Sequence, residues 1–140
     1  MQALGALYRF ATAVLAAAVV VQIGAAGFGA FNASEHVSET HPLTEHTFDN
    51  GFDFHTGFGY VVFIIGVVVF GLALAARRGR RPVLFSLALA VLVAIQIVLA
   101  WAAEGNHWVG PFHALLAFVI LGFAGMLAAR AWRGASVSPH

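Results

Sequence analysis

Long, nearly uncharged apolar stretches constrain this chain more than any other feature. Four of them span residues 4–31, 54–76, 83–103 and 111–131. Each is long enough to cross a bilayer as a helix, which requires about 20 residues. With 61% hydrophobic and 9% charged residues, the composition lies outside that of soluble globular domains. We therefore predict an all-α membrane protein: one four-helix transmembrane domain over residues 1–140, with one long loop over 32–53.

The distribution of charge predicts how these helices are oriented. All seven arginines lie near the N-terminus, in the 77–81 turn or near the C-terminus, whereas all six acidic residues lie in the 32–53 loop or at Glu104. Because arginine-rich segments stay cytoplasmic, we expect both termini in the cytoplasm and the long loop outside, in a prokaryotic inner or plasma membrane. The alternative, a cleaved secretory signal over the first stretch, is less favoured because that stretch is longer than a typical signal core.

The apolar stretches repeat in pairs. When the second is aligned with the fourth, His55 meets His113, and when the first is aligned with the third, Gln22 meets Gln96. Both pairs run in the same direction, so we expect a four-helix bundle built from two tandem helix pairs. Such pairs are related by a pseudo-two-fold axis along the membrane normal, which places the two histidines at equal depth near the outer face.

Each histidine is expected in the first turn of its helix. Asp53 is a candidate N-cap for the second helix, and Pro111 suits the first position of the fourth. The positive end of a helix disfavours an imidazolium, and a neutral imidazole is the form that binds a metal. His55 and His113 are therefore the candidate metal ligands, and no catalytic residue is predicted.

Small residues share a helix face with these polar positions. They are Gly59 and Gly66 after His55, Ala117 and Ala124 after His113, Ala26 and Gly29 after Gln22, and Ala100 and Ala103 after Gln96. One interpretation is close helix packing, with the histidines in water or lipid headgroups. The other is a flat space between the imidazoles that a haem would fill. In that case Gln22 and Gln96 would form hydrogen bonds around the site, lined by Gly59, Ala117, Ala26 and Ala100.

The strings FHTGFGY at 54–60 and GPFHALLAF at 110–118, with the paired glutamines and four spans, resemble one half of a heme A synthase. The resemblance implies a cytochrome b-like fold that binds one haem b per chain, with His55 and His113 as axial ligands. The chain departs from the family in two respects. Full-length members have eight spans, and Phe52 stands where the family has a glutamate associated with oxidation of the haem methyl group. Haem binding is therefore favoured over haem oxidation.

The predicted loop carries His36, His41 and His46 at five-residue spacing. This spacing matches neither a helix face nor a common zinc motif, so a solvated loop is favoured over a Zn or Cu site. The arginine-rich turn at 77–81 suits a role in topology and contact with membrane lipids, and nothing in it indicates nucleic-acid binding.

Three functions remain open from the sequence. The favoured one is a bis-histidine, b-type haem protein for electron transfer or haem handling, with a redox protein or a quinone as partner. The second is a half-size, heme A synthase-like oxidase that acts as a homodimer. The third is a cofactor-free subunit of a larger membrane complex.

Overall fold

The computed structural model describes residues 2–38 and 41–133 of the chain. Four long helices account for most of them: α1 (Gln2–Glu35), α2 (Glu45–Ala75), α3 (Arg80–Gly105) and α4 (Gly110–Arg133), with a short 3₁₀ helix, η1 (His107–Val109), before α4. Each of the four is long and apolar enough to cross a membrane. The prediction of an all-α, four-helix transmembrane architecture is confirmed.

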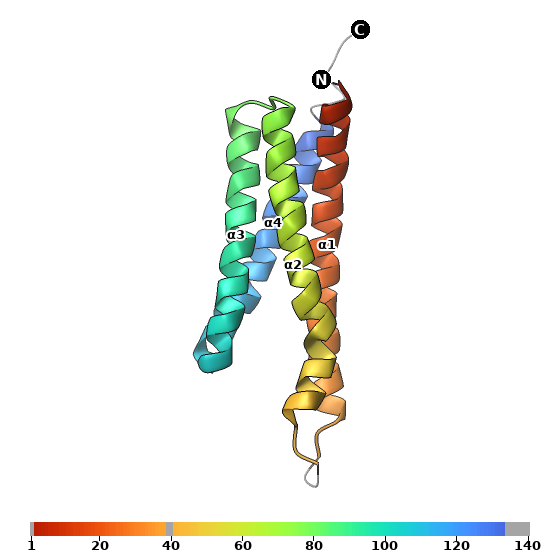
Figure 1. Ribbon diagram of the computed structural model, residues 1–140, viewed down its shortest axis with the longest axis vertical. Coiled ribbons are helices and arrows are strands. Elements are labelled where there is room, and N and C mark those ends of the chain that lie inside the picture. Colours follow the sequence, from red (N-terminus) through yellow and green to blue (C-terminus); the bar gives the residue numbers. More distant parts are fainter. Residues whose placement is uncertain (1, 39–40, 134–140) are drawn as a thin grey trace.

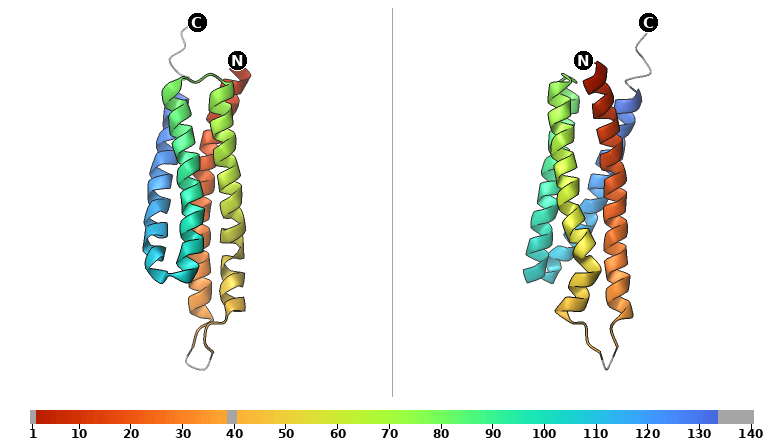
Figure 2. Two further views of the ribbon diagram at one scale, coloured as in Figure 1. Left: turned by 60° about the vertical axis from the view of Figure 1, so that its left-hand side comes forward. Right: turned by 45° about the vertical axis from the view of Figure 1, so that its right-hand side comes forward.

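The helices form an antiparallel bundle (Figure 1). α1 and α3 each contact both α2 and α4, so α2 and α4 lie on one diagonal of the bundle. Figure 2 shows that the start of α1, the α2–α3 turn and the end of α4 lie together. We call this the arginine end, because all seven arginines belong to these segments. The opposite end, with the α1–α2 and α3–α4 connections, is the loop end.

α2 begins well before its apolar stretch. The helix starts at Glu45, and the Thr44 hydroxyl caps it by accepting a hydrogen bond from the Thr47 backbone N at 3.2 Å. The Glu45 carboxylate in the first turn also stabilises the start of the helix, because it lies near the positive end of the helix dipole. The prediction that Asp53 is the N-cap is therefore wrong, because a threonine cap nine residues earlier already starts the helix.

This boundary changes two further predictions. The predicted loop over 32–53 is shorter, since the segment between α1 and α2 covers only residues 36–44, and His46 lies within α2. His55 lies about three turns inside α2 instead of in its first turn. His113 does lie in the first turn of α4, as predicted. The start of α2 differs from the prediction because an apolar stretch marks only the part of a helix that can enter hydrocarbon. The capping residue decides where the helix begins.

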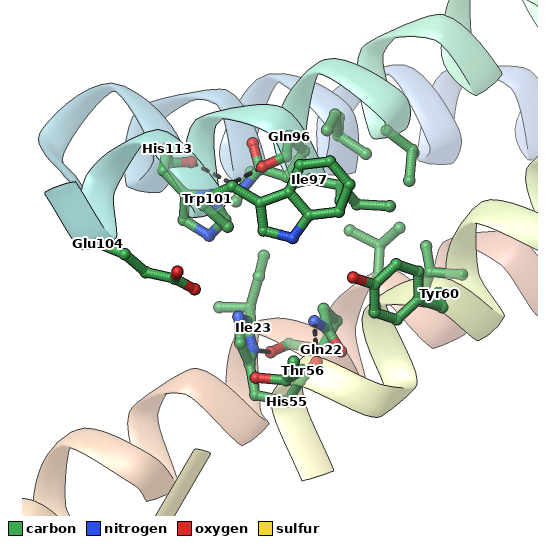
Figure 3. A pocket seen from close by; sticks show the side chains of 17 residues that line it. Gln22, Ile23, His55, Thr56, Tyr60, Gln96, Ile97, Trp101, Glu104 and His113 are labelled. Atoms are coloured by element: carbon green, nitrogen blue, oxygen red, sulfur yellow. Dashed lines mark hydrogen bonds between the residues drawn. The ribbon is translucent and has the colours of Figure 1, made fainter. Parts of the chain in front are cut away.

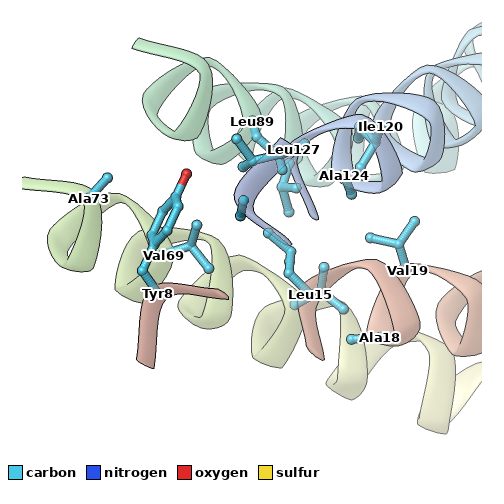
Figure 4. Packing of buried hydrophobic residues seen from close by; sticks show 13 residues of the cluster. Tyr8, Leu15, Ala18, Val19, Val69, Ala73, Leu89, Ile120, Ala124 and Leu127 are labelled. Carbon is cyan, nitrogen blue, oxygen red and sulfur yellow. The ribbon is translucent and has the colours of Figure 1, made fainter. Parts of the chain in front are cut away.

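The buried core lies largely in the half of the bundle nearer the arginine end, and Figure 4 shows how its side chains pack. Leu15, Val69 and Leu89 are completely buried there, from three different helices. Tyr8 of α1 is also buried, and its hydroxyl lies 3.3 Å from the Ser86 hydroxyl of α3, on the other diagonal. This hydrogen bond links two helices whose backbones do not approach each other closely.

Toward the loop end the two helix pairs separate. The α1–α2 pair continues past the end of α3 and α4, and the α3–α4 pair leans away from it (Figures 1 and 2). Within the α1–α2 pair the backbones stay close: a Cβ on Gly29 would lie 2.9 Å from the Gly51 carbonyl oxygen. The fold therefore combines a closed arginine end with a loop end where the helix pairs diverge.

Candidate functional site

His55 of α2 and His113 of α4 line one cavity at the point where the helix pairs diverge. Their ring centres are 6.2 Å apart and their planes make an angle of 72°. In Figure 3, His113 and Gln96 lie on one side of the cavity, and His55 and Gln22 lie on the other. The cavity is open on one side, and its volume is about 750 Å³ when the solvent space at its mouth is included. We call it the histidine cavity. The structure thus brings together four residues that are far apart in the sequence.

Each histidine forms two hydrogen bonds with the glutamine of the neighbouring helix. Gln22 Nε2 donates to the His55 carbonyl oxygen at 2.7 Å, and His55 Nδ1 lies 3.0 Å from the Gln22 carbonyl oxygen. In the second helix pair, Gln96 Nε2 donates to the His113 carbonyl oxygen at 2.8 Å, and His113 Nδ1 lies 3.0 Å from the Gln96 carbonyl oxygen. The same arrangement in both halves is what a duplicated helix pair would produce.

These hydrogen bonds determine the tautomer of both rings. A carbonyl oxygen can only accept, so Nδ1 must carry the proton in each histidine. In a neutral ring, Nε2 then keeps a free lone pair. Among the described residues, no hydrogen bond reaches either Nε2 atom. Histidines that bind metals through one nitrogen commonly donate from the other to a backbone carbonyl, so both rings are held in the form of a metal ligand.

The spacing of the two rings suits a single shared metal. A metal–imidazole bond is about 2 Å long and a ring nitrogen lies about 1 Å from the ring centre, so two imidazoles on one metal have centres about 6 Å apart. The observed 6.2 Å agrees with this value. The described residues hold no group of three or more histidine, cysteine or acidic side chains. A protein zinc site uses three or four such ligands, whereas a haem iron needs only two axial ones.

The small residues near the site have different roles. Gly59 allows the glutamine contact, because a Cβ there would lie 3.1 Å from Gln22 Nε2. Ala100 and Ala117 line the histidine cavity, as the haem interpretation predicts, whereas Ala26 is not among its lining residues. Gly66 instead packs α2 against α3, where its Cβ would meet the Ala90 Cα at 3.6 Å. Small residues therefore allow close helix packing at Gly66, whereas at Ala100 and Ala117 they line the histidine cavity.

Four larger side chains that line the cavity were missed from the sequence. They are Thr56 and Tyr60 of α2 and Trp101 and Glu104 of α3 (Figure 3). The aligned positions in the other half of the repeat are Ala114, Phe118, Gly27 and Ala30, and none of these lines the cavity. The cavity therefore extends toward the α2–α3 side. The internal repeat predicts only residues that both halves share. These four residues differ between the halves and were therefore not predicted.

Phe52, the position for which the resemblance to heme A synthases implies a glutamate, adjoins His55. The Phe52 ring stacks on Phe48 at 4.6 Å and meets the His55 ring edge-on at 6.1 Å. Among the described residues, the acidic side chain that lines the cavity is Glu104, on a different helix. The contact beside His55 is thus aromatic and offers no proton acceptor.

The four other histidines that the structure describes lie outside this cavity. His36 Nδ1 lies 2.8 Å from the Asn32 carbonyl oxygen, and His46 Nδ1 lies 3.3 Å from the Asn50 side chain one turn along α2. His41 lies beside Ser38 in the α1–α2 connection, and His107 packs on Trp108 in η1. Each has a local partner, and all four side chains are exposed.

Comparisons of the chain with protein-family models, with curated proteins and with solved structures found no match. The resemblance to heme A synthases therefore stays a prediction from the residues that carry it. What the site can do follows from its own geometry.

Proposed function

We propose that this protein binds one b-type haem between His55 and His113 within the membrane and serves electron transfer or haem handling. The observation that carries the proposal is a pair of imidazoles on diagonal helices, each with an Nε2 atom that makes no hydrogen bond to the described residues, whose ring centres lie 6.2 Å apart. Bound haem would supply a reversible one-electron carrier. A redox protein or a quinone would then be the partner.

The chain's own contribution is to fix the two rings. Each Gln22–His55 and Gln96–His113 pair is closed by two hydrogen bonds between neighbouring helices, so neither imidazole turns freely. Hydrogen bonds of this kind orient a ligand and raise its basicity. Ala100 and Ala117 leave room for a flat ring, and Tyr60 and Trp101 add aromatic surface to the lining of the cavity.

The same features favour electron transfer over oxidation of the haem. If His55 and His113 both held the haem iron, no coordination position would remain for oxygen. Phe52 beside His55 also provides no acid or base, which oxidation of a methyl group would require. A homodimeric, heme A synthase-like oxidase therefore remains the second candidate, and a cofactor-free subunit the third.

An absorption spectrum of the purified protein tests the proposal directly. We expect a Soret band with the narrow reduced bands of low-spin, six-coordinate haem, at one haem b per chain. Protein purified without haem and then titrated with hemin should acquire the same spectrum. No Soret band after that titration would leave the cofactor-free subunit as the function. A hydroxylated or formyl haem in mass spectra of the extract, after co-expression with a heme O supply, would favour the oxidase.

The orientation in the membrane gives a separate prediction. We expect reporter fusions after Ala33 and Gly105 to report an outside location, and fusions after Gly79 and at the C-terminus to report the cytoplasm. The reason is that every arginine lies at one end of the bundle and every acidic residue lies in segments at the other. The reverse pattern would move the histidine cavity to the cytoplasmic half.

A further inference from the structure

A second hollow lies at the arginine end, against α3 and α4. Three arginines line it: Arg78 of the α2–α3 turn, Arg81 of α3 and Arg130 of α4. Its apolar wall consists of Leu84, Phe85, Phe123 and Leu127. Its volume is about 1420 Å³ when the solvent space at its mouth is included. We call it the arginine groove.

Among the residues that the structure describes, no acidic side chain lines this groove. The described acidic residues, Glu35, Glu45, Asp49, Asp53 and Glu104, all lie in segments of the loop end. The guanidinium of Arg78 lies 5.3 Å from the Tyr8 ring centre and that of Arg130 lies 5.1 Å from the Phe85 ring centre. Aromatic faces attract cations but do not neutralise them. Arg78 Nε is also buried and has no hydrogen-bond partner.

The start of α3 adds to the positive potential. α3 begins at Arg80, and its N-cap, Gly79, makes no side-chain capping bond. The first backbone N–H groups of a helix have no partner within it, and they carry the positive end of its dipole. Arg81 and Pro82 of this first turn line the groove, and of the two only Arg81 carries a backbone N–H. Guanidinium groups and a helix N-terminus together are a setting that recognises phosphate.

We propose that the arginine groove binds one anionic phospholipid. Its phosphate would lie among Arg78, Arg81 and Arg130, and an acyl chain would lie along Phe85 and Phe123. A lipid is favoured over free phosphate because the cationic groups adjoin an apolar wall. That wall belongs to helices long and apolar enough to span the bilayer, where acyl chains surround them. The site is independent of the histidine cavity.

Native mass spectrometry of the purified full-length chain tests this site. We expect phosphatidylglycerol to stay bound at concentrations where phosphatidylcholine of the same acyl chains does not. The double variant Arg81→Gln with Arg130→Gln should weaken phosphatidylglycerol binding about tenfold or more. Arg78 is left intact because it packs on buried Tyr8.

The matched control removes two charges from the same end outside the groove. Arg80→Gln with Arg133→Gln should change phosphatidylglycerol binding less than about twofold, because neither residue lines the groove. An equal loss in both double variants would mean diffuse attraction and overturn the proposal, as would equal retention of phosphatidylcholine. Displacement of the lipid by millimolar inorganic phosphate would identify a free-phosphate site instead. Haem content, measured in every variant, should not change, which separates this test from that of the proposed function.

Discussion

Replacing either His55 or His113 with alanine should abolish the low-spin haem spectrum. Each imidazole lies on one side of the shared space, and nearby Gly59, Ala100 and Ala117 offer no substitute ligand. We expect haem content to fall at least about tenfold, with any remaining haem high-spin. Loss of a hydrogen bond to a ligand already lowers metal affinity by about tenfold or more, and loss of the ligand itself lowers it further. Optical spectra and haem quantification of each variant check this result.

His107→Ala is the matched control for the two ligand variants. This exposed histidine lies at the same end of the bundle, just before α4, and its ring packs on Trp108 outside the cavity. Its replacement should leave the spectrum unchanged. His55→Met adds a second control, because a thioether can ligate haem iron and should restore part of the six-coordinate spectrum. An unchanged spectrum in His55→Ala would show that the ligand assignment is incorrect.

Gly29→Val should destabilise the protein by about 2–3 kcal/mol, since adding volume where packing is already tight costs about that much. A Cβ on Gly29 would lie 2.8 Å from two carbons of the Phe52 ring and 2.9 Å from the Gly51 carbonyl oxygen. The ring can rotate, but the carbonyl belongs to the backbone of α2, so α1 and α2 would have to separate. The measurement is thermal or denaturant unfolding of the purified protein in detergent.

Gly27→Val is the control for this prediction, because a Cβ on Gly27 would meet nothing within 4 Å. Both substitutions place valine in the same part of α1, so the intrinsic helix cost is the same in each. The difference between the two variants therefore measures the α1–α2 contact. Equal unfolding midpoints would mean that the close approach at Gly51 does not contribute to stability.

The fold was predictable because bilayer thickness sets a minimum apolar length, and four stretches reach it. The start of α2 was not, because the residues from Glu45 to Asp53 are polar and hydropathy cannot distinguish a solvated helix from a loop. The decisive signal was local: Thr44 followed by an acidic residue, which is a common helix start.

The candidate site was also predicted only in part. His55, His113, Gln22 and Gln96 were found because they recur in both halves, and the structure gathers them around one cavity. The bonding pattern between them was not foreseen, because it depends on which backbone carbonyl lies opposite each ring. Ala26 was included by symmetry, yet the cavity extends toward α2 and α3 and leaves it out. An internal repeat can therefore locate shared ligands but not the side on which a site opens.

The Tyr8–Ser86 hydrogen bond has a mechanical consequence. It joins α1 to α3 within the packed end of the bundle. Where the helix pairs diverge, the side-chain hydrogen bonds of the described helices lie within each pair. The two helix pairs are therefore joined near Tyr8 and diverge toward the two imidazoles, so Tyr8 lies near the pivot, the point about which one pair could tilt relative to the other. A small change of angle at the pivot produces a larger change in the gap between the rings. Loosening the pivot should thus alter the grip on a bound ring system from the opposite half of the bundle.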